Sequence, residues 1–87
     1  MIERYTLIAF DSTHDAIAAS KLLSDIGAIV MPTLREIRAS CGISLRIAHE
    51  AADEASARLA FSCNGAWYLY NVVQNGGSVE CTAISLK

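Results

Sequence analysis

Five separate runs along this chain have the hydrophobic and polar pattern of β-strands. Residues 4–10 are mostly apolar on both faces, as expected for a central β-strand. Residues 28–34 form a second run, and residues 43–48 form a third whose apolar side chains occupy one face only. The last two runs, residues 66–73 and 79–86, are rich in branched and aromatic side chains. The pattern therefore predicts five strands.

Two of the connections between these runs have the period of a helix instead. The first helix is predicted to follow the N-cap residues at positions 11–15 and to continue through about Ile26. The second is predicted over residues 50–64, with an apolar stripe and an exposed Glu54–Arg58 pair at i,i+4 spacing. Gly27 and Gly65 stand where a left-handed residue commonly ends a helix.

The two remaining local signals concern the strands. Pro32 has no N–H group for a ladder, which places its strand at an edge of the sheet or ends the strand there. Asn75-Gly76-Gly77 is a hairpin turn signal that joins the last two strands.

The predicted order is β-α-β-β-α-β with one extra C-terminal strand. This is the order of a ferredoxin-like α+β sandwich, with two helices on one face of an antiparallel sheet. No linker divides residues 1–87, so we expect a single domain. Right-handed crossovers would bring three loops, residues 11–14, 35–42 and 63–65, to one end of the sheet and His49 to the other.

Composition narrows the function classes. A net charge of −2 gives no electrostatic footprint for nucleic acid, and the apolar runs are too short to span a membrane. The first residues do not resemble a secretory signal, which leads us to expect a cytoplasmic location. The three cysteines are odd in number and widely spaced, so they do not form a disulfide framework. We expect them to be free thiols under reducing conditions. With no C-x-x-C and two histidines, no zinc site is encoded.

The segment at residues 35–42 is the strongest candidate for a functional site, because it is too polar to form core and is longer than a tight hairpin needs. It contains Cys41, whose thiolate would be the reactive form. Positive charge, hydroxyl or backbone donors, and the N–H groups at the start of the first helix could favour that thiolate. The neighbours that supply the first two are Arg35, Arg38, Ser40 and Gly42. The alternative is that Cys41 is a small buried filler.

Other polar and aromatic residues are weaker candidates. His14 could act as a base or hydrogen-bond partner for the thiol, or be only a solvated neighbour of the helix cap. Cys63 is better explained as a buried helix-end residue than as a resolving thiol, and Cys81 as sheet packing. The aromatic side chains of the fourth strand have no basic groove beside them, so core or a subunit interface explains them better than base stacking. They are Trp67, Tyr68 and Tyr70.

Two segments together carry a family resemblance. Residues 35–46, Arg-Glu-Ile-Arg-Ala-Ser-Cys-Gly-Ile-Ser-Leu-Arg, with Phe10–Ala16 upstream, resemble a small bacterial family, DUF3343, described as selenium/sulfur carrier protein-like. The shared pattern is a strand ending in phenylalanine, a Ser-Thr-His helix start, and Ser-Cys-Gly before an alternating strand. The chain departs from it at Leu34 and Ala39, where the family tends to have proline and serine.

The resemblance implies that Cys41 accepts sulfur or selenium as a persulfide or selenopersulfide and passes it on. It implies at most a sulfurtransferase-like carrier without metal or organic cofactor, with a donor enzyme such as a cysteine desulfurase and an acceptor protein as partners. His14 and the neighbours of Cys41 would assist. Two alternatives stay open from the residues alone: a ferredoxin-like regulatory module that binds a small anion without covalent chemistry, and a structural subunit of a homodimer.

Overall fold

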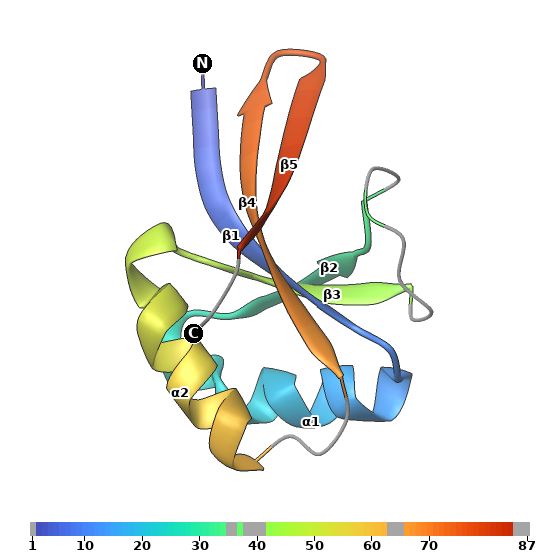
Figure 1. Ribbon diagram of the computed structural model, residues 1–87, viewed down its shortest axis with the longest axis vertical. Helices are drawn as coiled ribbons and strands as arrows, with labels where there is room; N and C mark the ends of the chain where they lie inside the picture. Colours follow the sequence, from blue (N-terminus) through green and yellow to red (C-terminus); the bar gives the residue numbers. More distant parts are fainter. Residues whose placement is uncertain (1, 35–36, 38–41, 63–65, 85–87) are drawn as a thin grey trace.

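A five-stranded antiparallel sheet and two helices make up this α+β chain (Figure 1). The computed structural model describes residues 2–34, 37, 42–62 and 66–84. The strands are β1 (Ile2–Phe10), β2 (Ile29–Pro32), β3 (Ile43–Ile47), β4 (Trp67–Asn75) and β5 (Ser78–Ile84). The helices are α1 (Thr13–Leu22) and α2 (Ala52–Ser62), and two short 3₁₀ turns accompany them, η1 (Ser24–Ile26) and η2 (His49–Ala51).

The strand order is β2-β3-β1-β4-β5, so β1 lies in the centre and the short β2 forms one edge. Pro32 ends this edge strand, which confirms the prediction drawn from its missing N–H group. Gly27 ends η1 with φ at 85°, a left-handed conformation that an L side chain rarely adopts. Gly76 has φ at 61° in the two-residue turn between β4 and β5, where the hairpin was predicted.

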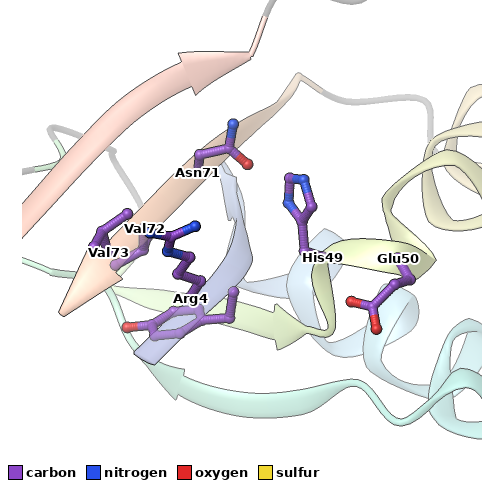
Figure 2. A pocket seen from close by; sticks show the side chains of 7 residues that line it. Arg4, His49, Glu50, Asn71, Val72 and Val73 are labelled. Carbon is purple, nitrogen blue, oxygen red and sulfur yellow. The ribbon is translucent and has the colours of Figure 1, made fainter. Parts of the chain in front are cut away.

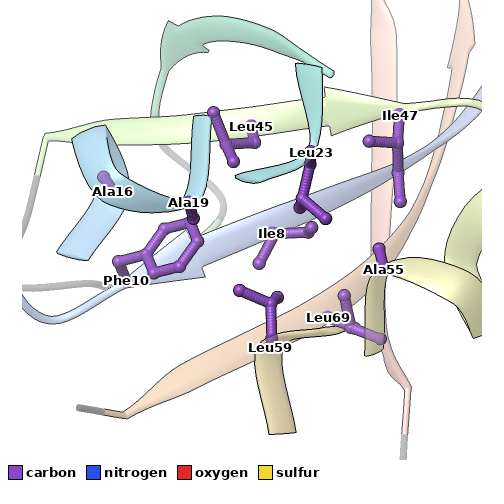
Figure 3. Packing of buried hydrophobic residues seen from close by; sticks show 10 residues of the cluster. All are labelled: Ile8, Phe10, Ala16, Ala19, Leu23, Leu45, Ile47, Ala55, Leu59 and Leu69. Carbon is purple, nitrogen blue, oxygen red and sulfur yellow. The ribbon is translucent and has the colours of Figure 1, made fainter. Parts of the chain in front are cut away.

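Both helices pack against the same face of the sheet (Figure 3). Phe10 and Ile8 of β1 share this face with Leu45 of β3, because residues two apart on a strand point the same way. The small and branched side chains of the helices complete the cluster: Ala16, Ala19, Leu23, Ala55 and Leu59. The apolar stripes predicted for the helices therefore form one continuous core with the sheet.

The opposite face of the sheet has a second buried cluster, in keeping with the apolar side chains predicted on both faces of the first strand. Tyr5, Leu7 and Val72 lie in it, and so does Ile37 from the connection between β2 and β3. Only 6% of Ile37 is exposed, and its N–H donates to the Leu34 carbonyl at 3.0 Å. The prediction that residues 35–42 are too polar to contribute core was therefore wrong at one position.

Each helix is shorter than its sequence pattern predicted. The first continues beyond Leu22 as the 3₁₀ turn η1, and the second begins after η2. Arg58 of α2 joins the two regions, since its guanidinium contacts the Asp25 carboxylate at 2.6 and 3.1 Å and Glu54 at 2.9 Å. The hydrogen bond from Arg58 holds the pKa of Asp25 below its usual value. The predicted Glu54–Arg58 pair is confirmed, with a second carboxylate added to it.

Candidate functional site

One end of the sheet gathers the described residues that flank the candidate cysteine segment. Ala9 of β1 pairs with Ser44 on one side and Tyr68 on the other, so residues 11, 42 and 66 follow at the same end. A backbone hydrogen bond of 3.4 Å from Asp11 to the Ala66 carbonyl joins two of these positions. Cys41, Cys63 and the proposed neighbours of the thiol lie outside the described residues; these neighbours are Arg35, Arg38 and Ser40.

The start of α1 lies at this end of the sheet (Figure 1). Ser12 is its N-cap, with an extended backbone and an Oγ that accepts from the Asp15 N–H at 3.4 Å. His14 lies in the first turn and is exposed, and it makes no hydrogen bond to another described residue. The first N–H groups of α1 therefore provide partial positive charge at this end, where an anion or a thiolate would be favoured.

A pair of hydroxyl side chains fixes the ends of β2 and β3, between which the cysteine segment runs. Ser44 is fully buried, and its Oγ lies 2.7 Å from the Thr33 Oγ1. The Thr33 N–H also donates to the Gly42 carbonyl at 3.0 Å. Gly42 itself is exposed, and a side chain added to it would meet open space. Thr33 and Gly42 are thus hydrogen-bonded to each other, and Ile37 packs on the second face.

Tyr68 contributes a contact at this end that the sequence analysis missed. Its hydroxyl donates to the Asp11 carboxylate at 3.1 Å, across 57 positions of sequence. The hydrogen bond to Asp11 and the negative charge of that carboxylate raise the pKa of Tyr68. Phe10 pairs with Trp67 in the sheet, and that register brings Tyr68 beside the end of β1, which no sequence pattern indicates. Asp11, predicted only as a capping residue, is therefore also an acceptor for a tyrosine.

We expect Asp11→Asn to lower the pKa of Tyr68 toward its ordinary value of 10.0, because the charge that opposes tyrosinate is removed. Absorbance of tyrosinate followed against pH measures this change, and a Tyr70→Phe background reduces overlap. Since the folded state binds the Tyr68 proton more tightly, the contact stabilises the fold below pH 10 and is lost at higher pH. An unchanged titration in Asp11→Asn would contradict the assignment.

Of the remaining candidates, Trp67 also lies at this end, where it pairs with Phe10, and the others lie elsewhere. Cys81 is half-buried against the second cluster, consistent with the sheet packing predicted for it. Trp67 packs against the helix-side core, whereas Tyr70 lies on the second face, so the aromatic side chains form no common platform. His49 lies after β3, at the other end of the sheet. In the described part of the chain no three histidine, cysteine or carboxylate side chains are grouped to hold a metal ion.

The described residues form an α+β fold in which the segment that contains Cys41 connects the edge strand β2 to β3. The chain belongs to the family described as "Putative Se/S carrier protein-like", whose model matches residues 5–75 of the 87. The match runs from Tyr5 within β1 to the end of β4, with Cys41 and its neighbours inside it, and stops before β5. Comparisons with curated proteins and with solved structures gave no match.

The lengths and compositions of the helices bear on whether one could cross a membrane. None of those in the described ranges has the length and apolar character needed to cross a bilayer.

Proposed function

We propose that this protein is a carrier that accepts a sulfur or selenium atom on Cys41 and passes it to an acceptor protein. Membership of the Se/S carrier-like family over residues 5–75 is the observation that carries this proposal. We also infer that the fold is a ferredoxin-like sandwich with β5 added at one edge. The strand order β2-β3-β1-β4 and the packing of both helices on one face support that inference.

The transfer needs no net oxidation or reduction. The Cys41 thiolate attacks the terminal sulfur of a persulfide on a donor enzyme, and a new S–S bond forms at Cys41. The S–S bond in the donor breaks, and the donor cysteine leaves as a thiolate. The acceptor then attacks the terminal atom on Cys41 in the same way, which restores the Cys41 thiolate. With selenium, the transferred atom is the terminal selenium of a selenopersulfide.

The described residues support an anionic sulfur at this position in the fold. The α1 N-terminus favours negative charge at the sheet end that also contains Gly42, the covalent neighbour of Cys41. We assign Arg35 and Arg38 the role of favouring the thiolate by their charge. Ser40 and the Gly42 backbone would donate hydrogen bonds to it, and His14 would deliver or remove a proton. Each of these roles is part of the proposal.

The proposal is tested by incubating the protein with a persulfide-loaded cysteine desulfurase, or with a selenopersulfide donor, and measuring its intact mass. We expect the mass to rise by one sulfur or selenium atom, and Cys41→Ser to abolish the rise. Cys63→Ser and Cys81→Ser are the matched controls and should still gain the atom. A wild-type protein that gains no atom, or an adduct that persists in Cys41→Ser, would refute the carrier role. Retained anion binding without an adduct would favour the regulatory module instead.

A further inference from the structure

A second candidate site lies at the other end of the sheet, where β1 and β4 extend past the helices (Figures 1 and 2). A cavity of about 450 Å³ opens there between the sheet and the η2 turn. Its polar lining consists of Arg4 from β1, Asn71 from β4, and His49 and Glu50 from η2. This volume lies within the range of small-molecule sites.

Opposite charges line this cavity from two different elements. Figure 2 shows Arg4 on the sheet side and Glu50 on the η2 side, with Asn71 and His49 nearby. Both charged side chains are exposed, and neither forms an ion pair with any residue that the structure describes. A positive and a negative group are thus available to a ligand without an existing pair having to break.

The side chain of Asn71, which also lines this cavity, has an oxygen without a hydrogen-bond partner among the described residues. Its Oδ1 is buried without a partner among the described residues, an arrangement that generally costs about 1–3 kcal/mol. The terminal torsion of an asparagine side chain is soft, so the amide can turn its oxygen toward a donor in the cavity. A ligand N–H group would then satisfy it.

His49 adds a candidate donor from the η2 side of the cavity, next to Glu50. Its Nδ1 lies 3.4 Å from the hydroxyl of Thr6, a fully buried side chain of β1. If that hydroxyl donates to Nδ1, the proton of a neutral ring is on Nε2. That N–H is then left for an acceptor in the cavity.

We propose that this cavity binds a small zwitterion of the α-amino acid class. The carboxylate would accept from Arg4 and from the His49 Nε2–H, and the ammonium group would donate to Glu50 and to the Asn71 Oδ1. An isolated anion would leave Glu50 and Asn71 without partners, and an isolated cation would leave Arg4 without one. A ligand with both charges gives each of these four side chains a partner.

This site is separate from the proposed carrier cysteine. The register places Arg4 opposite Val73 at one end of β1, whereas Gly42 lies beyond the other end. Binding of the zwitterion should therefore be unchanged in Cys41→Ser. The two proposals can then fail independently.

Titration of ¹⁵N-labelled protein with L-alanine, propionate or ethylamine tests the inference by NMR. L-alanine carries both charges, and the other two probes carry one each. We expect L-alanine to shift the Asn71 side-chain amide saturably, with each single-charge probe bound at least about tenfold more weakly. Arg4→Gln and Glu50→Gln should each weaken L-alanine binding by at least about tenfold.

Lys21→Gln and Asp53→Asn serve as charge-matched controls, because both side chains are exposed and outside the cavity lining. Both should bind L-alanine as the wild type does. Three results would overturn the inference: no saturable shift with L-alanine, equal binding of propionate, or equal weakening in the controls. Equal binding of propionate would mean that the cavity is an anion site.

Discussion

Replacing Phe10 with alanine is expected to lower the free energy of unfolding by about 3–5 kcal/mol. Phe10 is fully buried in the helix-side core (Figure 3), so the substitution removes apolar contacts and leaves a cavity that the surrounding structure fills only in part. At the usual stability per residue, 87 residues correspond to roughly 4–13 kcal/mol in total. The loss is therefore a large fraction of the whole. Urea denaturation followed by circular dichroism measures it.

The chain offers a matched control, because its other phenylalanine is almost fully exposed. Phe61 on α2 has 96% of its surface accessible, so Phe61→Ala removes no buried contact. We expect that variant to stay within about 0.5 kcal/mol of the wild type. Equal losses in the two variants would contradict the packing described for this core.

The difference between these two phenylalanines was readable in the sequence. Phe10 ends an alternating run together with Ile8, and the period of two assigns both to one face of a strand. Phe61 lies off the apolar stripe of its helix. Gly27, Pro32 and the turn at residues 75–77 were equally informative, because each acts through a local backbone constraint. Local constraints predicted which helices and strands form and their order, whereas both helices are shorter than predicted.

Contacts between residues far apart in the sequence could not be predicted from these local patterns. Ile37 is a single apolar residue in a polar segment, and no period shows that it covers the second face of the sheet. The Tyr68–Asp11 contact depends on the register of β1 with β4, which sequence patterns leave undetermined. The cavity at Arg4 and Asn71 arises because the sheet extends beyond the helices, which is a property of element lengths in three dimensions.

For the candidate carrier site, the sequence indicated the end of the sheet at which the segment is anchored. The described positions 11, 42 and 66 do lie at one end, as the predicted topology required. The roles of Cys41, Arg35, Arg38 and Ser40 stay predictions, because these residues lie outside the described ranges. Their support is the family match over residues 5–75.

The anchoring of that segment leads to the second large expected effect. Ile37→Asp should leave the helix-side core folded but release the connection between β2 and β3 from the second face. Detaching the segment gives up the burial of one isoleucine, about 1.5–3 kcal/mol. Keeping an ionised carboxylate buried among Tyr5, Leu7 and Val72 would cost more. Release of the segment is therefore the less costly response. Thermal unfolding should occur at a lower temperature, with the helical circular dichroism signal retained.

If Cys41 acts from a fixed position near the α1 N-terminus, this release should also slow its chemistry. We expect the rate of sulfur acceptance in Ile37→Asp to fall by at least about tenfold, since a loosened segment loses the orientation that favours reaction. The rate of mass gain from a persulfide donor measures it.

Ile29→Asp is the control, because the same charge is introduced on the neighbouring edge strand at a side chain that is 61% exposed. Ile29→Asp should react at the wild-type rate. An Ile37→Asp protein that accepts sulfur as fast as the wild type would show that the position of this segment does not control the thiol.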